Sequence, residues 1–215
     1  MGDEVALALA GVASAFVAYP RRQTLERCPH CGPPVRVDEA DLYWLALKLG
    51  NTVGGRDDVK ALLPMLLERL VTAEALDPEL VLGKLAQHEW GSWPEAERRA
   101  VEDYLDAVWG RLLAEFPSRV GAFTSAREFL RAIAAAHIEP ARYLRVWESD
   151  TGSAADRHLA KLVIETVYQR RPDAATVAWL RCEPVRERLF RAFERDHAGA
   201  WGDDFARAFD LSAML

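Results

Sequence analysis

SWPEAERRAVEDYLDAVWGRLLAEFP, residues 92–117, is the stretch of this chain that decides its fold class. It opens with the features of a helix start: Ser92 as N-cap, a proline early in the first turn, and Glu95 three residues after the serine. Large apolar residues then recur every three or four positions, as on the buried face of a helix: Val101, Tyr104, Leu105, Val108, Trp109, Leu112 and Phe116. Pro117 ends the pattern. The stretch therefore predicts one long helix that packs against a core.

The rest of the chain repeats this pattern on a shorter scale. Residues 125–128 form a second capping box in front of an apolar helix face. Asp38 is predicted to cap a helix that reaches Leu49, and Pro64 should either kink the next helix or delay its start. Further helices are predicted near residues 5–17, 57–70, 78–85, 139–149, 153–170, 173–182, 184–197 and 202–212.

No segment shows the strand alternation between hairpin turns that a sheet would need. We therefore predict an all-α fold of about 9–11 helices. Because the connections are short, successive helices should pack as antiparallel hairpins, in either a multi-helix bundle or a curved stack. The sequence fits a single domain over residues 1–215, and it also fits two packed halves near 1–117 and 118–215.

Composition and charge exclude several classes of partner. The 215 residues carry a net charge of −6, which argues against a nucleic-acid partner, because phosphate contacts need a surplus of lysine and arginine. The apolar run near the N-terminus follows the acidic Asp3 and Glu4 and is too short to cross a bilayer, so no membrane partner is predicted. Three cysteines, an odd number, fit a reducing compartment. We expect a cytoplasmic protein.

Cys28-Pro29-His30-Cys31 is the one place where reactive side chains are closely spaced. The tetrapeptide resembles the active site of the thioredoxin-like disulfide oxidants, and the resemblance implies a nucleophilic Cys28 and a resolving Cys31. Those enzymes place the motif at the start of a helix, whereas Pro33 and Pro34 follow here and prevent a regular helix. We interpret the resemblance as coincidental.

A zinc site is the second interpretation of this segment. Cys28 and Cys31, with His30 between them, could supply half of a tetrahedral site, which needs two further ligands. No second C-x-x-C is present, and the remaining donors are isolated in the sequence: His88, His137, His158, Cys182 and His197. The third interpretation is structural, with two small thiols that pin a loop. No cofactor is therefore expected, and zinc remains the alternative.

Trp90 and Trp93 lie close together beside a helix start and are candidates for contact with a partner. No complete catalytic set accompanies them: Glu194 and His197 have the spacing of only half a di-iron site, and His88-Glu89 lacks the second histidine of a zincin motif. The leading hypothesis is therefore a non-enzymatic helical scaffold that binds another protein or a second copy of itself. The alternative is a metal-binding or thiol-redox-responsive protein centred on residues 28–31.

Three segments of the first half resemble an uncharacterised group of bacterial all-helical hypothetical proteins: Cys28 to Cys31, Leu62 to Leu67 and Val81 to Leu85. The resemblance implies a bacterial, cytoplasmic origin. It brings no activity, cofactor or site residue with it.

Overall fold

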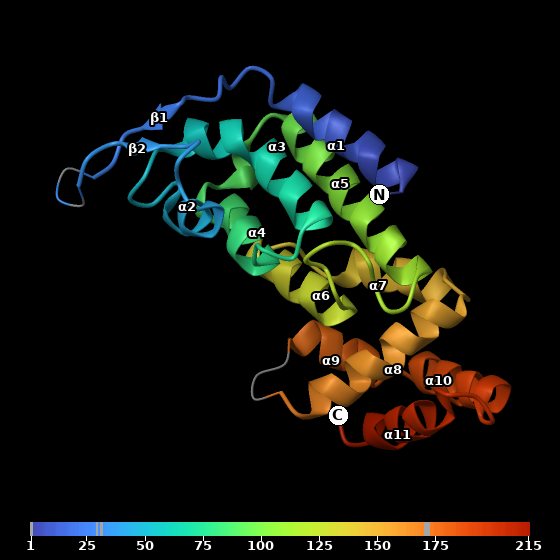
Figure 1. Ribbon diagram of the computed structural model, residues 1–215. Helices are drawn as coiled ribbons and strands as arrows, with labels where there is room; N and C mark the ends of the chain where they lie inside the picture. Colours follow the sequence, from blue (N-terminus) through green and yellow to red (C-terminus); the bar gives the residue numbers. More distant parts are fainter. Residues whose placement is uncertain (1, 29, 31, 170–172) are drawn as a thin grey trace. The chain divides into compact units, whose positions relative to one another are not determined.

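The computed structural model describes residues 2–28, 30, 32–169 and 173–215, and it confirms the all-α fold class (Figure 1). The described residues form eleven α-helices, a short 3-10 helix and one two-stranded sheet. The helices are α1 (Asp3–Ala15), α2 (Leu42–Lys48), α3 (Arg56–Thr72), α4 (Pro78–Gln87), η1 (Trp90–Ser92), α5 (Glu95–Ala114), α6 (Ala126–Ala135), α7 (Ala141–Ser149), α8 (Ser153–Val167), α9 (Ala174–Leu180), α10 (Glu183–Asp196) and α11 (Gly202–Ser212).

Among the described residues, a small hairpin interrupts the otherwise helical fold. Strand β1 (Thr24–Leu25) pairs antiparallel with β2 (Val35–Arg36), and the segment that carries the C-P-H-C tetrapeptide joins them (Figure 1). Each strand has only two residues, so no alternation of polar and apolar side chains could reveal it in the sequence. The all-α prediction is confirmed, while this hairpin could not be predicted from the pattern of the sequence.

One helix cap differs from the prediction, and for α3 the structure excludes one of two predicted alternatives. Asp41, and not Asp38, caps α2: its carboxylate accepts the Trp44 backbone N–H at 2.8 Å, while Asp38 accepts from Arg36. Several aspartates near a helix start can serve as the cap, and the backbone path decides which one does. Helix α3 begins at Arg56 and continues through Pro64, so the proline does not delay its start.

Helix α5 begins at Glu95, just beyond the capping box predicted at Ser92. Ser92 itself lies in η1, where its hydroxyl donates to the Glu89 carbonyl and accepts from the Arg56 guanidinium. The long helix predicted for this stretch is confirmed, and Val101, Tyr104 and Leu105 are fully buried on one face of it. The spacing of the apolar residues thus located the helix correctly. The predicted cap residue Ser92 instead forms hydrogen bonds with Glu89 and Arg56.

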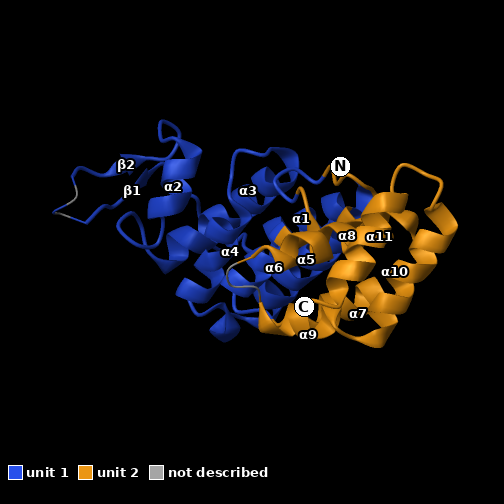
Figure 2. Cartoon of the chain, turned by 90° about the horizontal axis from the view of Figure 1, so that it is seen from below, with its two compact units in different colours: residues 1–111, 120–123, 128–138 blue, residues 112–119, 124–127, 139–215 orange. Residues whose placement is uncertain are grey.

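The chain divides into two compact units (Figure 2). Unit 1 comprises residues 1–111, 120–123 and 128–138, and unit 2 comprises residues 112–119, 124–127 and 139–215. The boundary predicted near residue 117 falls where the chain alternates between the two units, so no single cut separates them.

Among the described helices, none has both the length and the apolar content that crossing a membrane requires. A cytoplasmic location stays a prediction.

The core of unit 1 lies around α3. Its leucines are almost completely buried: Leu62, Leu63, Leu66, Leu67 and Leu70. The Tyr104 hydroxyl from α5 donates to the Leu67 carbonyl at 2.9 Å, and Trp109 stacks on Phe129 of α6 with ring centroids 4.7 Å apart. Gly121 has φ +49° and lies against the backbone at Leu70, where a side chain would collide with the helix.

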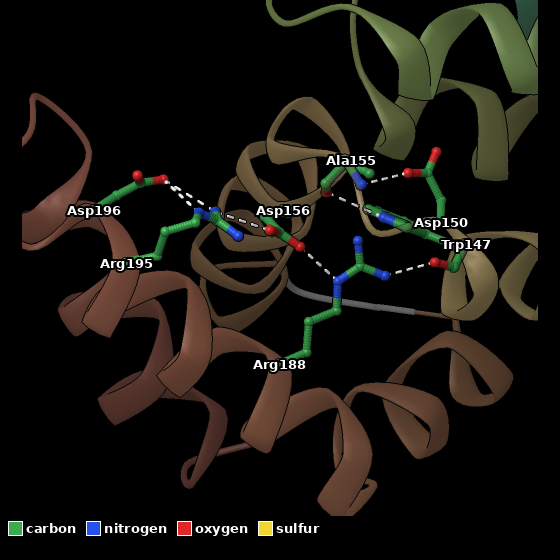
Figure 3. Close-up of polar contacts among 8 residues, drawn as sticks. Trp147, Asp150, Ala155, Asp156, Arg188, Arg195 and Asp196 are labelled. Atoms are coloured by element: carbon green, nitrogen blue, oxygen red, sulfur yellow. Dashed lines mark hydrogen bonds and ion pairs between the residues drawn. The ribbon is translucent and has the colours of Figure 1, made fainter.

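Unit 2 is organised by the buried carboxylate of Asp156 on α8, which is 4% exposed. Figure 3 shows Arg188 and Arg195, both from α10, converging on it: the Arg188 Nε lies 2.6 Å and the Arg195 Nη2 3.0 Å from its oxygens. Arg188 also donates to the Trp147 carbonyl, so the network ties α7, α8 and α10 together. Trp147 is fully buried beside Trp179. We interpret this network as a structural one.

His158 makes unit 2 sensitive to acid. Its imidazole is 1% exposed, and its Nε2 lies 3.0 Å from the Glu115 carbonyl oxygen. Burial lowers the pKa of His158 below its ordinary value of 6.5, and Lys161 acts in the same direction. Below pH 6.5 the unfolded chain therefore binds a proton that the folded chain resists, so stability must fall as the pH falls through this window.

We predict that His158→Gln reduces this acid sensitivity. A single proton bound only by the unfolded state gives a slope of about 1.4 kcal/mol per pH unit, and the variant should lose part of the slope between pH 6.5 and 5. Urea unfolding at a series of pH values measures the unfolding free energy and therefore this slope. The matched control is His197→Gln, because His197 is exposed. Identical slopes in wild type and the His158 variant would contradict the assignment.

Candidate functional site

The C-P-H-C segment follows β1 and is anchored to the loop after α2. The Cys28 N–H donates to the Thr52 carbonyl at 2.9 Å, and the Gly54 N–H donates to the Glu26 carbonyl at 2.7 Å. The half-buried Cys28 thiol lies 4.0 Å from His30 Nδ1. Pro29 and Cys31 lie outside the described residues. A metal ion or a disulfide shared by the Cys28 and Cys31 sulfurs is therefore still a prediction.

The surroundings of Cys28 differ from those of a thioredoxin-like nucleophile. Within the described part of the chain, the next helix after Cys28 is α2, which begins only at Leu42. Residues 32–34 form no helix, so no helix begins directly after the tetrapeptide as it does in those enzymes. This is the context expected from Pro33 and Pro34.

The other predicted zinc ligands are dispersed. In unit 1, the His88 Nε2 is buried with its ring against Gly50, while His137 adopts φ +58° at the end of α6. In unit 2, the exposed Cys182 thiol donates to the Ala178 carbonyl, and His158 and His197 contact backbone carbonyls. Across residues 2–28, 30, 32–169 and 173–215, no three histidine, cysteine or acidic side chains gather as a metal site would require. A site that includes Cys31 stays a prediction.

The two candidate tryptophans pack into unit 1. Trp93 is 3% exposed, its ring meets Phe16 edge-on at 5.8 Å, and its indole N–H donates to the His88 carbonyl. The half-buried Trp90 donates its indole N–H to the Ala136 carbonyl at 3.1 Å. Trp93 therefore offers almost no surface to a partner, and Trp90 offers only part of its ring.

Trp93 helps to enclose a buried ion pair that the sequence analysis missed. The Lys60 ammonium on α3 lies 2.6 Å from the Glu97 carboxylate on α5, and both side chains are 6% exposed. The Tyr19 hydroxyl donates to the other oxygen of Glu97 and accepts from Lys60. Lys60 also lies 4.6 Å from the Trp93 ring centroid. Each polar group in this cluster has a partner.

Lys84 on α4 is a second buried lysine, with a different environment. It is 1% exposed, and among the described residues the hydrogen-bond acceptors of its ammonium are neutral: the Leu47 carbonyl at 3.3 Å and the Gln87 amide oxygen at 3.4 Å. Both distances exceed those of a strong hydrogen bond. Burial lowers the pKa of Lys84 from 10.5, with no opposing charge to restore it. The buried Lys84 ammonium therefore lowers the free energy of unfolding at neutral pH.

The described residues of α1 and α5 form an open groove on unit 1. The two helices run antiparallel, since Gly2 lies beside Arg111 while Tyr19 bonds to Glu97 (Figure 1). The groove holds about 1020 Å³. Its lining is dominated by small residues of both helices: Ala8, Gly11, Ala15, Ala96, Ala100 and Ala107.

An exposed apolar side chain and separated charges line this groove. Leu7, at one wall, is 76% exposed. Glu4 lies near the start of α1, while Arg99 and Glu95 lie near the start of α5, at the opposite end of the groove, and form an exposed ion pair at 2.5 Å. No catalytic or metal-binding set accompanies them among the described lining residues. The arrangement suits the docking of a helix, because small side chains allow a close approach of backbones.

Comparison with known proteins gives no relative from which to transfer a function. No protein family, no curated protein and no solved structure matches the chain. A function of this chain must therefore be inferred from its own residues, above all those of the groove and of the C-P-H-C segment.

We predict that the two buried lysines respond oppositely to replacement by methionine. Lys60→Met leaves Glu97 buried without a cation and should cost about 3–5 kcal/mol of unfolding free energy. Lys84→Met removes a buried amine with only weak partners and should leave stability unchanged or raise it by up to about 2 kcal/mol. Any gain should shrink as the pH approaches 10.5, where the unfolded chain also loses this proton. Urea unfolding measures both, and a large loss in the Lys84 variant would contradict this account.

We predict that the protein purified without chelator carries less than about 0.1 zinc per chain, because a closed site needs four ligands. Elemental analysis, with thiol titration under reducing and oxidising conditions, measures zinc and any Cys28–Cys31 disulfide. The Cys28→Ser variant should match the wild type, and Cys182→Ser is the control. Stoichiometric zinc that Cys28→Ser abolishes would establish the metal alternative instead.

Proposed function

We propose that this protein is a non-enzymatic helical scaffold that binds a helix of a partner protein in the α1–α5 groove. The observation that carries the proposal is the groove itself: about 1020 Å³, open, and lined mainly by alanine and glycine from two antiparallel helices. Binding of a helix in a groove is a recurrent mode of protein recognition that needs no catalytic group.

The chemistry of the groove defines the helix that it accepts. Its small lining residues favour a helix with an apolar stripe at positions i, i+3 or i+4, and i+7. Leu7 is exposed at its wall and gains burial only when a partner covers it. The charges lie at the two ends, where Glu4 and Arg99 can pair with charges at the ends of the bound helix.

The test is a selection of helical peptides from a displayed library against the purified full chain, followed by affinity measurement. Selected peptides should carry the apolar stripe and bind with a dissociation constant on the order of 10 μM, as expected for a single short helix. Gly11→Trp should weaken their binding at least about tenfold, because the indole fills the groove.

Gly11→Ala is the matched control. No atom lies within 4 Å of the position that an added Cβ would take at Gly11, so alanine fits without collision and improves helix propensity by roughly 1 kcal/mol. It should bind the peptides as the wild type does. Peptides that bind the Gly11→Trp variant undiminished, or a selection that yields no helical binder, would overturn the proposal.

A further inference from the structure

We propose that the helix held by the α1–α5 groove is α1 of a second copy of this chain, so that the protein forms a dimer with two-fold symmetry. The inference rests on the proposed function and names its partner. In this arrangement each copy contributes both a groove and the helix that fills the other groove.

Helix α1 has the surface that its own groove accepts. After Asp3 and Glu4 it contains no charged residue, and only Val5 and Val12 of the helix are buried in its own unit. Leu7 is 76% exposed, which leaves a large apolar side chain in water on a helix rich in alanine. A soluble chain gains free energy when such a face is covered, and an equivalent face on a second copy covers it.

The small residues of α1 fit an antiparallel pair. A two-fold axis between Ala8 and Gly11 places Ala8 of each copy opposite Gly11 of the other. It also brings Leu7 of each copy near the free space at Gly11, where no atom lies within 4 Å of an added Cβ. The contact is thus the same on both sides, as a closed two-fold interface requires.

The charges select the antiparallel orientation. Glu4 and Ser14 are about 15 Å apart along α1, at the helix rise of 1.5 Å per residue, and Arg99 lies at the Ser14 end of the groove. The symmetry therefore brings Glu4 of each copy to Arg99 of the other. A parallel pair would instead bring the two Glu4 carboxylates together, which is unfavourable.

Arg99 is available for this contact. Its ion pair with Glu95 is exposed, with the two side chains 68% and 72% accessible, so the guanidinium can take a second carboxylate. Asp103 lies between the ends of the groove, where it meets the uncharged middle of the second α1.

Sedimentation of the full chain from about 1 to 300 μM tests the dimer, and charge reversal tests its geometry. The wild type should dimerise with a dissociation constant on the order of 10 μM. Glu4→Arg and Arg99→Glu should each weaken the dimer at least about tenfold, because each places like charges together. The double variant restores opposite charges and should recover the wild-type constant within about threefold.

Glu74→Arg is the control, because it makes the same change of charge at an exposed residue outside the groove. It should dimerise as the wild type does, and circular dichroism should show all variants equally helical. A wild type that stays monomeric at 300 μM, a double variant that fails to recover, or an equal loss in Glu74→Arg would each overturn the dimer. If the wild type stays monomeric but still binds helical peptides in the groove, the proposed function stands without the dimer. If it neither dimerises nor binds such peptides, the proposed function is overturned as well.

Discussion

The groove of unit 1 depends on the buried ion pair between Lys60 and Glu97. The pair joins α3 to α5 at 2.6 Å, and Tyr19, just beyond α1, bonds to both charged groups. Neither charge has access to enough water to be stable alone, so each holds the other in place. Because the cluster fixes the end of α1 against the start of α5, it also sets the separation of the two groove walls.

The same small residues that allow α1 to pack also leave its outer face incomplete. Alanine and glycine contribute little apolar surface, so α1 is anchored mainly by Val5, Val12 and by Phe16 just after it. Phe16 in turn packs edge-on against Trp93, beside the ion pair. A helix anchored by few large side chains and lined with small ones presents a shallow groove, and this geometry is the basis of the proposed partner binding.

Much of the helical fold could be predicted from the sequence, because helix periodicity is a local property. The face through Val101, Tyr104 and Leu105 is buried as its spacing indicates, and α8, α10 and α11 lie close to their predicted ranges. Local signals failed where several residues competed for one role: Asp41 caps α2 in place of Asp38. They also failed for the two-residue strands around the C-P-H-C segment, which are too short to carry a pattern.

The candidate site could be predicted only in part. The sequence marked Trp93 as a candidate for contact with a partner, whereas the structure buries it beside Lys60. Lys60 and Glu97 are 37 residues apart, and nothing in either local sequence distinguishes them from exposed charges on a helix surface. The groove likewise lies between α1 and α5, which are far apart in the sequence. No local sequence pattern therefore marked its alanines as functional.

The sequence by itself determined that this chain folds as helices, because the spacing of apolar residues sets which faces avoid water. It also set the acidic net charge, from which we expect no nucleic-acid partner. Only the tertiary structure decided which lysine has an ionic partner and which helices enclose a groove. Burial and pairing depend on contacts between segments distant in the sequence, and those contacts exist only once the helices have packed.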